Sequence, residues 1–246
     1  MTADTPVVFV PGMLCDAQLW AEVDPGPGFR VVPGAIDAPS ISGMAEQVLS
    51  AVDGPFVLAG LSLGAIAGFE VLRRAPERIL GFCAVSTNPH APTATQYRSW
   101  HDMAFRTTRG EFETVVREII APTMFGELSG TPELVDRFVA MALRVGPARF
   151  QSQLRAQADR FDSVPSLGAV HCPALVVSAD DDALCPREYH RTIAAAIEGS
   201  RFETIAGAGH LCTWEVPQLI SELLSDWLPA VARYRTTRQE STCPQF

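Results

Sequence analysis

The sequence contains no lysine, so all 19 of its Lys and Arg residues are arginine. This absence excludes a catalytic lysine base and a lysine Schiff base. Acidic side chains exceed basic ones, with 28 Asp and Glu residues, a formal net charge of −9 and a sequence pI near 5.0. A chain of this charge is a poor partner for nucleic acid, for an anionic membrane surface or for an acidic carrier protein.

Long apolar runs are also missing, since none approaches the roughly 20 residues that a membrane-spanning helix needs. The first residues, Met1-Thr2-Ala3-Asp4-Thr5-Pro6, lack the basic region, apolar stretch and small-residue cleavage site of an export signal. We therefore expect a cytoplasmic protein that acts on a small molecule and does not bind membranes.

The six cysteines form no C-x-x-C pair and show no spacing typical of a metal site. Cysteines of this kind in a cytoplasmic protein are most often buried, reduced thiols. Cys185 and Cys212 lie near chemically interesting positions, but we interpret them in the same way. The cysteine pattern therefore predicts no metal site.

Apolar runs rich in β-branched residues alternate with helical patterns, and 47% of the residues are hydrophobic. This alternation is typical of a parallel sheet covered by helices on both faces, an α/β fold. We expect about six strands, all parallel, at residues 6–10, 29–32, 56–59, 79–86, 174–178 and 201–205.

The alternation stops for some eighty residues after the fourth predicted strand. Residues 89–164 show no strand pattern and four helical stretches, at 95–107, 110–121, 132–144 and 147–160. We predict a core made of residues 1–88 and 166–230, a helical insertion at 89–165, and a loosely ordered tail at 231–246. Large apolar side chains of the insertion are candidates to contact a substrate: Trp100, Met103, Met124, Phe125 and Phe138.

The serine turn, Gly60-Leu61-Ser62-Leu63-Gly64, follows one predicted strand and opens into a helix. This is the G-x-S-x-G pattern in the strand, turn and helix setting that lifts a serine hydroxyl clear of a sheet. Such a hydroxyl becomes a nucleophile only when a base accepts its proton and fixed donors receive the developing negative charge. If the strand at 6–10 lies beside the one before Ser62, the N–H of Met13 faces that of Leu63 and the two form an oxyanion hole.

Only one of the five histidines lies where a parallel sheet would place a base. His210 follows the last predicted strand in the glycine-rich loop Ala206-Gly207-Ala208-Gly209, whereas the other four lie in the insertion, before a strand or on a helix. The predicted strand at 174–178 is followed by Ala179 and then by Asp180, Asp181 and Asp182. Any one of these three carboxylates could orient the imidazole.

At these residues the chain resembles an α/β-hydrolase over about residues 6–229, in the order nucleophile, acid, histidine. The resemblance implies a Ser62, Asp182 and His210 triad, because the family carries an aspartate four residues before a proline and here that proline is Pro186. It also implies an oxyanion hole at Met13 and Leu63 and a cap formed by the insertion. The chain departs from the family by Pro11-Gly12 in place of His-Gly, by Ala179 in place of glycine, and by the missing N-terminal hairpin.

The resemblance implies a serine hydrolase that cleaves a carboxylic ester or lactone without a metal or cofactor. One alternative is a carbon–carbon bond hydrolase of ring-cleavage products, whose substrate carboxylate an arginine of the insertion would bind: Arg98, Arg106, Arg109 or Arg160. Another is a ligand receptor on the same fold that does not turn over its ligand. The substrate's identity and the oligomeric state stay open at this point.

Overall fold

A computed structural model describes residues 4–127 and 130–242 of the chain, and their side chains as far as residue 237. These residues form one sheet in the order β2-β1-β3-β4-β5-β6, and every neighbouring pair is parallel. The predicted six parallel strands are therefore confirmed. Their bounds are β1 Thr5–Val10, β2 Phe29–Pro33, β3 Phe56–Leu61, β4 Ile79–Val85, β5 Ala174–Ala179 and β6 Arg201–Ile205.

The four inner strands are apolar because helices cover both of their faces. Successive side chains of β1 alternate between two clusters, with Val7 and Phe9 in one and Val8 and Val10 in the other. The clusters lie on opposite faces of the sheet, since side chains of a strand alternate with a period of two. The edge strand β2 is half exposed and correspondingly more polar.

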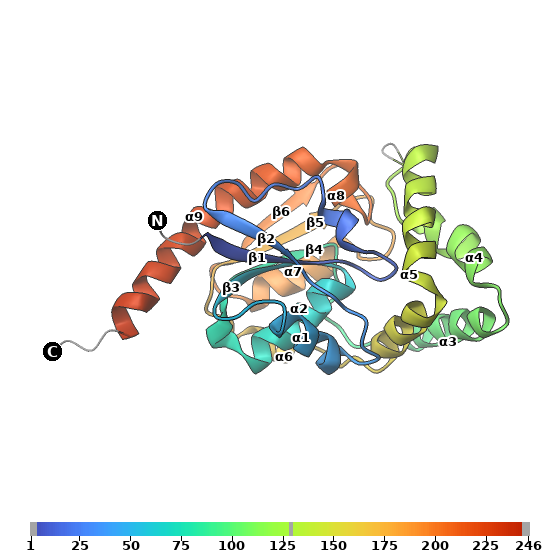
Figure 1. Ribbon diagram of the computed structural model, residues 1–246, viewed down its shortest axis with the longest axis horizontal. Coiled ribbons are helices and arrows are strands. Elements are labelled where there is room, and N and C mark those ends of the chain that lie inside the picture. Colours follow the sequence, from blue (N-terminus) through green and yellow to red (C-terminus); the bar gives the residue numbers. More distant parts are fainter. Residues whose placement is uncertain (1–3, 128–129, 243–246) are drawn as a thin grey trace.

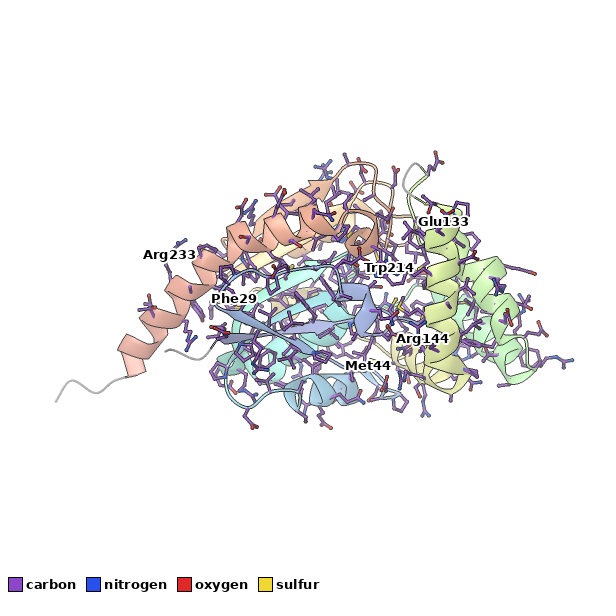
Figure 2. All side chains as sticks on the ribbon, turned by 45° about the horizontal axis from the view of Figure 1, so that its top comes forward. Phe29, Met44, Glu133, Arg144, Trp214 and Arg233 are labelled. Carbon is purple, nitrogen blue, oxygen red and sulfur yellow. The ribbon has the colours of Figure 1, made fainter. Side chains whose placement is uncertain are left out.

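One face of the sheet is covered by α1 (Ile41–Leu49), α2 (Leu63–Arg74), α6 (Val164–Leu167) and α7 (Arg187–Ala196). The other is covered by the short helices η1 (Ala17–Trp20) and α8 (Cys212–Glu215) and by the long helix α9 (Pro217–Thr242) (Figure 1). Figure 2 labels one buried side chain of each cluster, Met44 of α1 and Trp214 of α8.

Between β4 and β5 the described residues form no strand, and the helices that precede α6 there make up the insertion. They are α3 (Ala94–Thr108), α4 (Phe112–Thr114), a π-helical segment at Val115–Ile120, a 3-10 turn at Ala121–Thr123, and α5 (Pro132–Ala158). Helix α5 bends at Gly146, whose φ of 83° is not helical, immediately before Pro147. Figure 1 shows these helices grouped at one end of the sheet.

Arg144 ties this helical group to the core. Figure 2 labels Arg144 on α5. Its Nη2 donates to Asp16 Oδ2 at 3.1 Å and to Gln18 Oε1 at 2.7 Å, at the start of η1. The insertion is thus fixed to the loop that follows β1, which also faces the serine turn.

The amphipathic pattern of the sequence predicts a helix at residues 217–228, and helix α9 is longer than this. The apolar periodicity ends near Leu228, but the helix continues to Thr242, so the prediction of a loosely ordered tail from residue 231 is wrong for its described part. The first of the extra residues, as far as Arg235, have tertiary contacts with the core. Val231 packs on the sheet beside Gly81, and Arg235 Nη1 donates to Thr5 Oγ1 at 2.6 Å. Among the helices of the described ranges, none has the length and apolarity required to cross a membrane.

The contact of α9 with the sheet depends on the missing side chain of Gly81. A Cβ there would lie 2.6 Å from Val231 Cγ2 and 3.0 Å from the Trp227 ring. We expect Gly81→Val to lower the free energy of unfolding by about 1–3 kcal/mol through overpacking. Gly168→Val is the control, because Gly168 is exposed and its nearest non-neighbouring atom would be 3.9 Å away. Urea unfolding followed by circular dichroism measures both, and equal effects would contradict this packing.

Candidate active site

Ser62 occupies the turn between β3 and α2 in a strained backbone conformation, with φ 55° and ψ −116°. Positive φ is uncommon for a residue other than glycine and persists only where the surroundings enforce it. The Ser62 N–H donates to Val85 O at 2.9 Å, and Ser62 O accepts from Thr87 Oγ1 at 2.9 Å. Residues at the end of β4 and just after it therefore hydrogen-bond to both backbone polar groups of Ser62.

Both flanking glycines are required by close backbone contacts. A Cβ at Gly60 would lie 2.5 Å from Ala65 N, and one at Gly64 would lie 2.5 Å from the carbonyl oxygens of Val10 and Pro11. No side chain fits at these distances. The glycine at position 64 therefore lets the end of β1 pass directly against the serine turn.

That contact places the loop after β1, which carries Met13, beside the serine turn. β1 pairs with β3 as expected, with Val10 opposite Gly60, and an ideal Cβ on Gly12 would lie 3.5 Å from Ser62 Cβ. Within the described part of the chain, neither Met13 N nor Leu63 N donates to a protein acceptor. Leu63 is the first residue of α2, where the helix dipole favours negative charge.

The structure brings together two further residues of the predicted triad. His210 Nδ1 lies 2.9 Å from Asp182 Oδ2 and 3.0 Å from Oδ1, and both side chains are buried. Asp182 Oδ1 also accepts from Leu184 N at 2.8 Å and from Cys185 N at 2.9 Å. The carboxylate of Asp182 therefore has fixed donors around it and bonds to the Nδ1 edge of the imidazole.

Burial of Asp182 acts to raise its pKa, but the charge and hydrogen bond of His210 and the N–H groups of Cys185 and Leu184 outweigh it. The resulting pKa of Asp182 lies below its ordinary value, so the carboxylate is ionised at neutral pH. Of the other two candidate acids, Asp180 accepts from Gly207 N at 2.6 Å, and both Asp180 and Asp181 are exposed.

Glu215 fixes the loop that carries His210. Its carboxylate accepts from Gly209 N and from Gly126 N, each at 3.0 Å, and Leu211 N donates to Met124 O at 2.9 Å. These bonds join the histidine loop to the helical insertion. The sequence contained no signal for Glu215, because its partners are backbone groups of two separate segments.

Ser62 and His210 open onto one cavity of about 290 Å³ between the carboxyl ends of the strands and the insertion. Met13 also lines it, as do three of the five predicted substrate contacts, Trp100, Met103 and Met124. The sequence reasoning did not select its other polar wall residues, which are Asn88, Gln96, Ser99, Thr123 and Gln157.

Phe125 and Phe138, the other two predicted substrate contacts, do not line this cavity. Phe138 is fully buried in the apolar cluster beneath α5, and the backbone of Phe125 lies against Gly209. Apolar character alone could not separate a side chain that faces a cavity from one that fills the core.

His190 is a second buried histidine near the site, and it supports the serine turn indirectly. Its Nε2 accepts from Thr87 N at 2.9 Å, and Thr87 in turn bonds to Ser62 O. Burial lowers the pKa of His190 to about 4, so the ring is neutral at pH 7 and can act as this acceptor.

Asp182, Cys185 and His210 place potential metal-ligand atoms within 4.8 Å of one another. The chemistry of this set does not favour a metal. Burial and the charge of Asp182 raise the pKa of the Cys185 thiol well above its ordinary value, whereas a thiol must be deprotonated to bind a metal. The Asp182 carboxylate is also already engaged by His210 and two N–H groups.

Comparison with known proteins identifies relatives along most of the chain. A model of the alpha/beta hydrolase fold family matches residues 44–217. The chain is 25% identical over 244 residues to the biotin biosynthesis bifunctional protein BioHC of Cellvibrio japonicus, covering 92% of this chain but only 48% of that protein. It is 24% identical over 210 residues to a pimeloyl-[acyl-carrier protein] methyl ester esterase of Neisseria meningitidis, covering 81% of this chain and 82% of the relative.

Comparison with solved structures also identifies a hydrolase similar to this chain. The malate-bound thermophilic esterase of Thermogutta terrifontis superposes with a TM-score of 0.84 at 26% identity, covering 92% of this chain and 90% of that one. This similarity extends over both the sheet and the inserted helices, since it includes nearly the whole chain.

Removing the charge of Asp182 tests the role of the Asp182–His210 pair. We expect Asp182→Asn to lower kcat for a p-nitrophenyl ester by about 10⁴-fold, because the amide no longer fixes the imidazole tautomer that accepts a proton. Asp181→Asn is the matched control, since Asp181 is an exposed neighbour in the same loop. If both variants keep nearly full activity, the pair does not orient a base.

The same pair also predicts a pH dependence of stability. The pKa of Asp182 is lower in the folded chain than the value of about 3.9 of an unfolded aspartate. The contribution of the Asp182 carboxylate to the free energy of unfolding is therefore fully present above the unfolded pKa, and it is lost as the pH falls through the folded pKa. The difference in unfolding free energy between wild type and Asp182→Asn should shrink from pH 7 to pH 3, as measured by urea unfolding, and a constant difference would contradict the shift.

Proposed function

The chain belongs to the alpha/beta hydrolase fold family, whose model matches residues 44–217 of its 246 residues, and on this premise we propose that it is a serine hydrolase of a small carboxylic ester or lactone. One observation carries the proposal. A serine in a strained turn and a histidine held by a buried carboxylate open onto the same cavity. The names of the relatives support ester chemistry for this site.

In this proposal Ser62 Oγ attacks the carbonyl carbon while His210 Nε2 accepts the hydroxyl proton. Asp182 holds His210 Nδ1 and stabilises the imidazolium that forms. The negative charge that develops on the carbonyl oxygen is received by the N–H groups of Met13 and Leu63. Both amides lack an acceptor within the described residues, which supports this assignment.

The tetrahedral intermediate then collapses, and His210 returns the proton to the leaving alcohol. The alcohol departs from an ester and stays attached to the acyl group in a lactone. A water molecule next attacks the acyl-enzyme while His210 accepts its proton. His210 then returns this proton to Ser62 Oγ as the acid is released. No step of this sequence calls for a metal or a cofactor.

Residues 89–165 act as a cap over this site in the proposal. Trp100, Met103 and Met124 extend from them into the cavity wall and favour an apolar portion of the substrate. A small-molecule substrate also fits the net charge of −9, which disfavours an acidic carrier protein as partner.

Replacing the nucleophile tests the proposal directly. We expect Ser62→Ala to lower kcat for p-nitrophenyl butyrate by at least about a thousandfold and to abolish labelling by a fluorophosphonate, read by intact mass. The control is Ser50→Ala, since Ser50 is exposed at the end of α1 and its hydroxyl donates to Glu46 O, within its own helix. Near-normal hydrolysis by Ser62→Ala would refute the mechanism. Labelling of wild type without multiple turnovers would indicate a receptor instead.

A further inference from the structure

Arg160 is a buried cation in the wall of the cavity that Ser62 and His210 line. Its exposed fraction is 6%. Arg160 Nε donates to His90 O at 2.9 Å, Nη1 donates to Gln157 Oε1, and Cζ lies 5.1 Å from the centroid of the Trp100 ring. All of these partners are neutral groups.

The charge on Arg160 has no counter-ion in the described part of the chain, where no carboxylate oxygen lies within 4.0 Å of it. Its Nη2 is buried and has no hydrogen-bond acceptor among these residues. Burial lowers the pKa of Arg160 to about 10, which still leaves the guanidinium protonated at neutral pH. A buried, unpaired charge is costly, so such a group is usually compensated by an anion.

The other three arginines of the insertion that could bind a substrate carboxylate do not share this environment. Arg106 and Arg109 contact Glu111, and Arg98 is exposed and donates to Thr95 Oγ1. None of the three lines the cavity. The structure therefore separates one candidate from the four that the sequence offered.

Arg160 shares the cavity wall with Cys185 as well as with Ser62 and His210. The Cys185 N–H holds Asp182, and its sulfur lies within 4.8 Å of a ring nitrogen of His210. An anionic group bound at Arg160 would thus be near the histidine side of the cavity.

Resting on the proposed function, we propose that the substrate carries a carboxylate that binds Arg160, so that the enzyme cleaves a monoester of a short dicarboxylic acid or the corresponding carboxylated lactone. Nε is bonded to His90 O and Nη2 is buried, so the carboxylate would bind through Nη1, where it competes with Gln157 Oε1 for a charge-assisted hydrogen bond. The apolar wall at Met103, Ile119 and Met124 accommodates the methylene chain.

General electrostatic attraction cannot produce this preference. The net charge of −9 repels anions from the molecule as a whole. A preference for an anionic ester over a neutral one of the same shape would therefore require a local cation.

The test compares monomethyl glutarate with methyl 5-methylhexanoate, in which an isopropyl group replaces the carboxylate. Methanol release gives kcat and KM for wild type, Arg160→Gln, Arg160→Lys and the control Arg98→Gln, which removes the same charge from an exposed site. We expect Arg160→Gln to lower the preference in kcat/KM for the anionic ester by about tenfold to a hundredfold. The loss should appear mainly in KM, with the neutral ester little changed. Arg160→Lys should retain part of the preference and Arg98→Gln all of it.

Equal losses on the two esters would overturn the inference and make Arg160 a structural residue, as would an unchanged preference. Should Arg160→Gln fail to fold, wild type alone decides the question. Glutarate should inhibit hydrolysis of p-nitrophenyl acetate at least about tenfold more strongly than the neutral glutaramide, and equal inhibition would overturn the inference. Ser62-dependent hydrolysis of the neutral ester without an anionic preference removes only this inference, whereas no Ser62-dependent hydrolysis of either ester removes the proposed function itself.

Discussion

The close approach of β1 to the turn at Ser62 is the constraint on which the site depends. The backbone carbonyl oxygens of Val10 and Pro11 lie 2.5 Å from the position that a Cβ of residue 64 would take, so β1 can approach the turn this closely only because that residue is glycine. This close approach fixes the loop at Gly12 and Met13 beside the serine, and it does so with main-chain atoms of the sheet. Groups held in this way need no reorganisation when charge develops next to them, which is the condition for effective electrostatic stabilisation.

The two buried charges of the site, on Asp182 and Arg160, have opposite surroundings. Asp182 is surrounded by donors, namely His210 and the N–H groups of Leu184 and Cys185, and its pKa falls despite burial. Arg160 has only neutral partners, and its pKa falls because burial is not offset by a carboxylate. The negative charge of Asp182 is compensated by groups of the protein itself. The positive charge of Arg160 would be compensated by an anionic ligand, which is why the two charges indicate different roles.

The insertion and the core are connected where the chemistry would take place. Arg144 bonds to Asp16 and Gln18 after β1, and Glu215 joins Gly209 of the histidine loop to Gly126. The insertion therefore contacts both of the loops that carry Met13 and His210. Both links are polar contacts between segments far apart in sequence, so each depends on the whole fold being formed.

The sequence by itself determined the α/β class, the six parallel strands and the serine turn, because these follow from local patterns: apolar runs, helix signals and glycines at a turn. It offered three aspartates for one position and four arginines for another, and it extended the candidate cavity wall to Phe125 and Phe138. It also ended α9 too early. Only the tertiary structure decided that Asp182 meets His210, that Arg160 is buried without a counter-ion among the described residues, that the two phenylalanines do not line the cavity, and that α9 continues past Leu228. The physical reason is that pairing, burial and cavity lining depend on distances between segments that are remote in sequence, and no local pattern encodes those distances.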